Sequence, residues 1–346
     1  LRLPRTRLGA SSLVLLVGAR AYPVAPALGK SPIHLPLVSL LVACSAEGQP
    51  LASSAPPGAA GPAASAPRPT SSMSATPSAS AHLQPAPPPL PVRAPGELAG
   101  ETLDFPFDGK AVGDPTQSYE GRVFIPDRAS VAPGPVPLVV FFHGLNRALI
   151  PHRWMGGGDE GDVRKIVGEL VSAGAVAPLV LAGPGSVEKA AVSGGASFPT
   201  FDFDRFVDLT ERSLGDRVKI DRERVVVLGH SGAGCSAKGG IVSATASKIV
   251  PLAIVSIDTC MPGALADALG RAGPKTHVIV TWQTATWDRD FRHFRAVFDA
   301  RVKESPAHAG VRRARAALPN LPRSHDATVK QTFDKWLPRL LPPPKD

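Results

Sequence analysis

The segment RVVVLGHSGAG, which runs from Arg224 to Gly234, decides the fold of this chain. Its first half is a β-branched apolar run of the kind that forms buried parallel strands. Its second half places Ser231 at the apex of a glycine-flanked turn, and small residues that can start a helix follow. A strand, a sharp turn with a serine and a helix make up a nucleophile elbow, in which the serine backbone is strained and only small neighbours fit.

One position departs from the usual G-x-S-x-G spacing of such an elbow. Ala233 stands where the last glycine is expected, and Gly234 comes one residue later. Since a methyl group is the smallest change from glycine, we expect the turn to survive. The motif alone leaves a second interpretation open, namely a glycine-rich turn between a strand and a helix with an incidental serine.

The composition divides the chain into three parts. Residues 46–96 hold 13 of the 38 prolines and consist mostly of Ala, Pro and Ser. Such a segment buries too little apolar surface to offset its ordering entropy, so we interpret residues 45–97 as a disordered tether. Residues 98–346 have the length of a single α/β domain and are predicted to carry the fold.

Residues 1–44 have the features of an export signal. Basic residues come first, and the apolar run from Ile33 to Ala43 is short for a membrane span but suits a signal peptide. The letters LVAC at residues 41–44 resemble a bacterial lipobox, which predicts a lipid anchor at Cys44. The chain is then exported and held in the bacterial cell envelope, with Ser45 favouring the outer membrane. The alternative is a signal peptide cut elsewhere, and acylated Cys44 in mass spectra of membrane fractions would decide between them.

The net charge of +9 does not indicate a nucleic-acid partner. Five of the basic residues lie before Cys44, where the sequence has no acidic residue. The dense basic cluster from Arg312 to Arg315 lacks interleaved aromatic residues and is interpreted as a solvated face. We therefore expect no nucleic acid among the partners of this chain.

From Leu98 onward, apolar runs of strand length alternate with segments of helical periodicity. This alternation indicates an α/β fold, a mostly parallel twisted sheet with helices on both faces and right-handed crossovers. The expected strands are 103–107, 121–125, 137–142, 177–181, 225–228, 249–257, 277–282 and 314–318, of which the first two form a hairpin. The expected helices are 162–173, 203–214, 262–271, 291–302 and 327–340.

With the elbow after the fifth expected strand, this order resembles the α/β-hydrolase fold over nearly all of residues 98–340. The string PLVVFFHG at residues 137–144 and the string KIDRERVVVLGHSGAG at residues 219–234 resemble secreted esterases of the polyhydroxybutyrate-depolymerase and feruloyl-esterase type. The resemblance implies a serine hydrolase with a Ser-His-Asp triad.

The resemblance assigns Ser231 as the nucleophile and His325, in the loop before the last expected helix, as its general base. Two residues compete for the acid that orients the imidazole. Asp258 directly follows an expected buried strand, where an acid is seldom present for packing. Asp288 lies beyond the next strand, nearer to the usual place of the acid in this family, but it also suits the N-cap of the helix through Phe291. Asp258 is preferred and Asp288 is kept as the alternative.

The tetrahedral intermediate of acyl transfer needs two backbone N–H donors. By resemblance, Gly232 supplies one donor directly after the nucleophile, and Leu145 supplies the other from the loop after the third expected strand. His143 and Gly144 begin that loop, so both are expected beside the substrate, where glycine lets the backbone approach closely.

The sequence offers an acyl pocket but no cofactor site. Trp154, Met155 and Phe198 belong to glycine-containing loops that are expected to line the pocket for the acyl group. No group of His, Cys, Asp and Glu residues has the spacing of metal ligands, so neither a metal nor another cofactor is expected.

Cys235 and Cys260 are the two cysteines that remain if Cys44 is lipidated. Cys235 lies one turn beyond Ser231, and Cys260 follows the next strand. Neighbouring strands would bring the two within disulfide range in an oxidising compartment. A pair of small buried thiols is the alternative.

These residues together predict a serine hydrolase that cleaves small-molecule or polymeric carboxylic esters through an acyl-enzyme. A serine peptidase or amidase is the nearest alternative, because the same triad cleaves amides. A non-catalytic binding protein on a hydrolase scaffold is the other, since a fold does not guarantee an activity.

Overall fold

Apolar runs rich in β-branched and aromatic residues form the strands of one sheet. The computed structural model describes residues 89–94, 96–115, 118–158, 161–186, 197–319 and 324–344. The strands within these residues are β1 (Gly100–Asp108), β2 (Ser118–Pro126), β3 (Val136–Phe142), β4 (Val180–Ser186), β5 (Ile220–His230), β6 (Ala253–Ile257), β7 (His277–Gln283) and β8 (Arg313–Leu318).

The eight strands follow the order β1-β2-β4-β3-β5-β6-β7-β8. From β4 to β8 all neighbouring strands are parallel, whereas β2 pairs antiparallel with both β1 and β4. The sheet is therefore mixed, with a parallel body and an antiparallel edge that contains the expected hairpin. This architecture is consistent with an α/β-hydrolase fold. Because β5, β6 and β7 are parallel neighbours, their carboxyl ends meet at one edge of the sheet.

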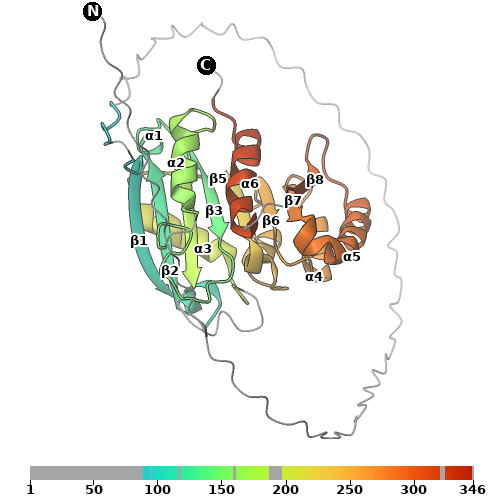
Figure 1. Cartoon of the computed structure of the whole chain (residues 1–346). Helices are drawn as coiled ribbons and strands as arrows, with labels where there is room; N and C mark the ends of the chain where they lie inside the picture. Colours follow the sequence, from blue (N-terminus) through green and yellow to red (C-terminus); the bar gives the residue numbers. More distant parts are fainter. Residues whose placement is uncertain are drawn as a thin grey trace, which may run out of the picture. The chain divides into compact units, whose positions relative to one another are not determined.

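Helices connect the strands and cover the sheet (Figure 1). The α-helices of the described residues are α1 (Asp127–Ser130), α2 (Val163–Ser172), α3 (Phe203–Leu214), α4 (Gly263–Gly270), α5 (Thr284–Glu304) and α6 (Ser324–Leu340), and the 3₁₀-helices are η1 (Gly109–Val112), η3 (Ser231–Gly234) and η4 (Gly240–Thr245). Side chains cap three of them at the start, where Asp108 accepts from Lys110 N, Asp162 from Arg164 N and Asp202 from Arg205 N. Within the described part of the chain, every helix is too short or too polar to cross a bilayer.

The alternation of side chains along β3 explains the two apolar layers. Every residue of β3 is buried, and successive side chains point to opposite faces. Leu138, Val140 and Phe142 join a core with residues of α3, α4 and α5. Val139 and Phe141 join a second core with residues of α2 and α6, which run side by side in Figure 1. A strand covered on both faces needs a continuous apolar run, as its sequence shows.

The observed bounds of several elements differ from the expected ones. No α-helix follows β5 directly; the chain continues in η3 and η4, because glycine-rich sequence lowers helix propensity. α5 begins at Thr284 rather than Phe291, and α6 begins at Ser324 rather than Ala327. β4 begins three residues later than expected, beyond Pro178, which has no N–H to donate to the sheet.

Residues before Leu98, the expected start of the domain, also contact it. The Arg93 guanidinium donates to Asp127 Oδ1 over 2.7 Å and to Asp127 Oδ2 over 3.0 Å. The described fold therefore has contacts upstream of the boundary that the composition suggested.

Candidate active site

The turn after β5 holds Ser231 in a strained conformation. Its φ is +51°, a left-handed value that non-glycine residues seldom adopt. A Cβ added to Gly144 would lie 2.8 Å from Ser231 Cβ and 3.3 Å from Ser231 Oγ, so only glycine lets the loop after β3 approach this hydroxyl. Ala233, which replaces the usual glycine, is fully buried in the core beneath the turn. The turn therefore accommodates the extra methyl group.

Asp258 follows β6 directly and is completely buried. Its φ of +45° is also left-handed, and its N–H donates to Thr281 O over 2.9 Å. The side chain of Gln283, the last residue of β7, donates to Asp258 Oδ2 over 2.7 Å, and its backbone N–H donates to Oδ1 over 2.8 Å. Asp258 Oδ2 also lies 2.7 Å from Nδ1 of His325. Three donors thus converge on one buried carboxylate, as burial of a charge requires.

His325 lies in the first turn of α6 and not in a loop, because the helix begins one residue earlier than this position. Its side chain is 38% exposed, so the imidazole is open to solvent on one side while Nδ1 contacts the buried Asp258. Asp288, the other candidate acid, lies inside α5, whose N-cap is Gln283. The expected N-cap role of Asp288 is therefore wrong, because the helix begins earlier than its apolar spacing indicates.

His230, the last residue of β5, packs its ring on that of His325 with the ring centroids 4.6 Å apart. Its Nε2 lies 3.0 Å from the backbone oxygen of His325. Burial, followed by the neighbouring charge of His325, lowers the pKa of His230 to about 3. A neutral His230 can donate from Nε2 to that carbonyl, which fixes the start of α6 against the end of β5.

Ser231 and His325 are not joined by a hydrogen bond. Among the described residues, neither Ser231 Oγ nor His325 Nε2 has a hydrogen-bond partner. The shared contact of both residues is His230, which precedes Ser231 in the chain and packs against the imidazole of His325 at an interplanar angle of 38°. Hydrogen bonds of catalytic groups are often long in proteins without substrate and shorten in the reacting complex.

The loop after β3 places His143 in the interior. Its side chain is 3% exposed and packs against the ring of Phe198, with the centroids 5.1 Å apart. Burial lowers the pKa of His143 to about 4, so the imidazole is neutral at pH 7. Leu145 is partly buried, and its Cγ would lie 3.0 Å from a Cβ on Gly232. The two residues expected to supply backbone donors, Leu145 and Gly232, are therefore in contact.

The expected acyl-pocket residues do not line an open pocket. Trp154, Met155 and Phe198 are at most 4% exposed. Trp154 packs edge-on against Phe141 and against His230, and so fills the layer beneath the site. In the described structure these side chains fill the interior next to the elbow, and their contact with a substrate stays a prediction.

A disulfide joins Cys235 and Cys260, whose Cα atoms are 5.1 Å apart. It links the chain directly after η3 to the chain two residues beyond Asp258. Cys44, the predicted lipidation site, lies outside the described residues, as does the rest of the predicted signal and most of the tether. The lipid anchor therefore stays a prediction.

One group of potential metal ligands occurs in the described residues. Donor atoms of His230, His325 and Asp326 lie within 4.8 Å of one another. Two of these groups have partners already, since His230 Nε2 contacts His325 O and His325 Nδ1 contacts Asp258.

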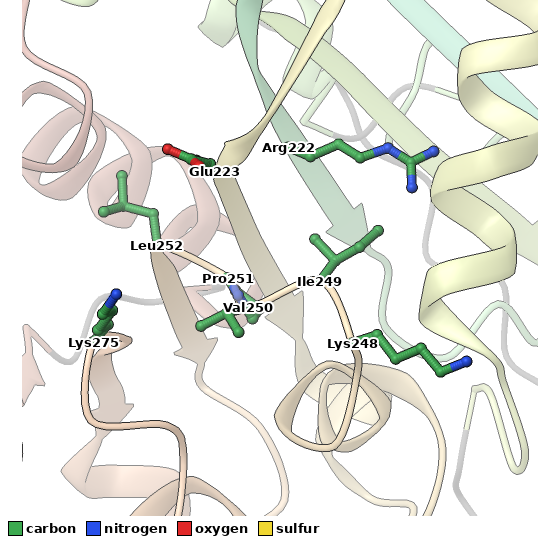
Figure 2. A pocket seen from close by; sticks show the side chains of 8 residues that line it. All are labelled: Arg222, Glu223, Lys248, Ile249, Val250, Pro251, Leu252 and Lys275. Atoms are coloured by element: carbon green, nitrogen blue, oxygen red, sulfur yellow. The ribbon is translucent and has the colours of Figure 1, made fainter.

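A hollow of about 580 Å³ lies at the opposite edge of the sheet, where β5, β6 and β7 begin (Figure 2). It contains none of the expected site residues. Arg222, one of its basic side chains, is neutralised by Asp208 and Glu211. Its lining residues are Arg222, Glu223, Lys248, Ile249, Val250, Pro251, Leu252 and Lys275.

No protein-family model and no curated protein sequence matches the chain. A solved structure described as a ferulic acid esterase matches with a TM-score of 0.52 and 15% identity, over 71% of this chain and 99% of its own. A mutant of the feruloyl esterase module from Clostridium thermocellum matches at 0.47 and 11%, over 72% and 90% of the two chains. S-formylglutathione hydrolase from Staphylococcus aureus matches at 0.46 and 13%, over 70% and 98%. The chain thus shares its fold with the ferulic acid esterase.

Proposed function

We propose that this chain is a serine hydrolase that cleaves carboxylic esters through an acyl-enzyme intermediate. The observation that carries the proposal is the buried Asp258 carboxylate 2.7 Å from His325 Nδ1, at the edge of the sheet where the strained Ser231 follows β5. An imidazole whose Nδ1 is held by a carboxylate presents Nε2 as a base. The esterase names of the structural neighbours agree with this chemistry.

In the proposed reaction, Ser231 Oγ attacks the ester carbonyl carbon and gives its proton to His325 Nε2. Asp258 holds the imidazole in the required tautomer and stabilises the imidazolium that forms. The backbone N–H groups of Gly232 and Leu145 bind the oxyanion. When the intermediate collapses, the alcohol leaves with the proton from His325, and water then releases the acyl group by the same steps. This assignment favours Asp258 over Asp288 as the acid, because Asp258 contacts the imidazole.

A fluorophosphonate probe and a pair of matched chromogenic substrates test the proposal. We expect the probe to label the wild-type protein, and the protein to hydrolyse p-nitrophenyl acetate. Ser231→Ala should abolish labelling and lower kcat by about 10⁶-fold, as loss of a triad serine does. Ser213→Ala, which removes a partly buried hydroxyl on α3, serves as the control and should behave as wild type.

The alternatives give different results in the same assay. Faster turnover of the matching p-nitroanilide than of the ester would identify an amidase. If the wild-type protein is neither labelled nor active, the remaining interpretation is a non-catalytic binding protein on a hydrolase scaffold. For the acid, Asp258→Asn should lower kcat by about 10⁴-fold. Such a loss in Asp288→Asn alone would reverse the choice of acid.

A further inference from the structure

The hydroxyl of Ser197 is buried beside the elbow without a hydrogen-bond partner. The residue is 3% exposed, and its Oγ has no partner within the described part of the chain. An unpaired buried hydroxyl is unfavourable, and more than nine in ten buried polar groups are paired. Most other serines near the site are paired; for example, Ser236 Oγ donates to Pro199 O and accepts from Gly239 N. The orphan hydroxyl of Ser197 therefore needs an explanation.

The position of the Ser197 hydroxyl explains why it has no partner in the protein itself. The backbone N–H of Ser197 donates to Gly232 O over 3.2 Å, which fixes the residue against the turn that carries Ser231. A Cβ added to Gly232 would lie 2.5 Å from Ser197 Oγ and 3.0 Å from Leu145 Cγ. The hydroxyl thus lies over the Cα of Gly232, next to Leu145. These are the two residues whose backbone N–H groups bind the oxyanion in the proposed function.

We propose that Ser197 is a catalytic residue whose hydroxyl donates a third hydrogen bond to the oxyanion. The inference rests on the proposed function and deepens it. When Ser231 Oγ bonds to the carbonyl carbon, the π electron pair moves to the carbonyl oxygen, and the serine proton moves to His325. The Ser197 O–H donates to that oxygen and keeps its own proton throughout. When the electron pair returns and the alcohol leaves with the proton from His325, the hydrogen bond weakens again.

A donor of this kind acts on the transition state more than on the bound ester, because the oxygen carries its charge only in the tetrahedral state. Its removal should therefore lower kcat and leave KM nearly unchanged. The fold should not suffer, because the hydroxyl has no partner to lose. Removal of a serine hydroxyl that only supports the fold would instead lower stability and would not act selectively on kcat.

The test compares Ser197→Ala with Ser236→Ala, a neighbouring buried serine whose hydroxyl is paired. For Ser197→Ala we expect kcat for p-nitrophenyl acetate to fall about 100-fold, with KM within threefold. The thermal midpoint should equal or exceed that of the wild type. Inhibition by phenylboronic acid, which forms a tetrahedral adduct with the serine, should weaken by a similar factor. For Ser236→Ala we expect a lower thermal midpoint.

Each remaining outcome overturns the proposal. If Ser197→Ala keeps full kcat while Ser231→Ala is inactive, the protein is a serine hydrolase but Ser197 is not a third oxyanion donor. If Ser197→Ala loses thermal stability and activity together, with unchanged relative affinity for the boronic acid, the hydroxyl is structural. If the wild-type protein is neither labelled by the fluorophosphonate nor active, the proposed function fails and this inference fails with it.

Discussion

Two residues with left-handed backbones, Ser231 and Asp258, flank the same edge of the sheet. Such conformations cost about 1–3 kcal/mol each and persist only where the surroundings determine them. At Ser231 the surroundings are the close approach of Gly144 and the end of β5. At Asp258 they are hydrogen bonds from and to β7, through Thr281 and Gln283. The strain thus lies where neighbouring strand ends hold the backbone.

Gln283→Leu should impair catalysis through Asp258. The change removes one of the two donors on Asp258 Oδ2, leaves His325 Nδ1 as the other, and keeps the backbone bond to Oδ1. We expect kcat/KM to fall about 10-fold to 100-fold, because a slight misplacement of a catalytic group has that effect. The measurement is kcat/KM beside the free energy of unfolding, which should drop by about 1–3 kcal/mol.

Gln331→Leu on α6 is the matched control, and its kcat/KM should equal that of the wild type. If Gln283→Leu lowers stability while kcat/KM keeps its wild-type value, Gln283 supports the fold alone and has no role in positioning the acid.

At the residue scale, sequence reasoning finds some positions of the candidate site and misses others. Ser231 stands in a motif and Asp258 follows a buried apolar run, so both are visible to sequence reasoning. Gln283 also ends a strand, but a glutamine there belongs to no motif and its partner is 25 residues away. Ser197 is visible only through the approach of its chain to Gly232. The burial of Trp154 was not predicted, because loop sequence does not reveal which aromatic rings pack in the interior.

At the element scale, helices with a clear apolar stripe were predicted closely. The bounds of α3 are those expected, and α2 differs by one residue at each end. The first two turns of α5 were missed, because residues 284–290 have no apolar stripe to indicate a helix. The segment after β5 was expected to become an α-helix, but its glycines favour short 3₁₀-helices.

The disulfide supplies the tertiary constraint that a helix would otherwise provide after β5. It ties the end of η3 to the loop after β6, and so connects the turn of Ser231 with that of Asp258. Replacing both Cys235 and Cys260 by alanine should lower the free energy of unfolding by about 3 kcal/mol, given a sequence separation of 25. We expect kcat to fall as well, since both turns become less restrained. Denaturant unfolding and ester turnover at saturating substrate measure the two effects.

Dithiothreitol provides the control for this double variant. It should bring the wild-type protein towards the stability of the variant and leave the variant itself unchanged. Equal free energies of unfolding for the oxidised wild type and the variant would show that the crosslink contributes nothing to the fold.

At the scale of the whole molecule, one sheet separates two apolar layers, and the candidate site lies where both layers end. Sequence alternation predicted a sheet covered on both faces, because strands with unbroken apolar runs have no face for water. It did not predict that two histidines, His143 and His230, would be taken into the interior under the site. His143 directly follows β3 and His230 is the last residue of β5, so their burial depends on how the strand ends pack.

These two histidines make the stability of the protein depend on pH. Burial lowers the pKa of His143 to about 4 and that of His230 to about 3, with the charge of Arg153 lowering both. In the unfolded chain both titrate near 6.5. The unfolded state therefore binds protons as pH falls below 6.5 while the folded state does not, and stability decreases. Their contribution is complete above pH 6.5 and is lost progressively until the folded pKa values are reached.

Between pH 7 and pH 5 each histidine should cost the wild-type protein about 2 kcal/mol of unfolding free energy. His230→Gln removes one titrating group, so the variant should lose about 2 kcal/mol less than the wild type over this interval, whatever its stability at pH 7. Urea unfolding at both pH values measures the difference, with His308→Gln as an exposed control that should match the wild type. Carboxylates contribute little here, because they titrate near pH 4 in the unfolded chain. An equal loss in His230→Gln and the wild type would mean that His230 titrates alike in the folded and unfolded states, which would contradict the lowering of its pKa by burial.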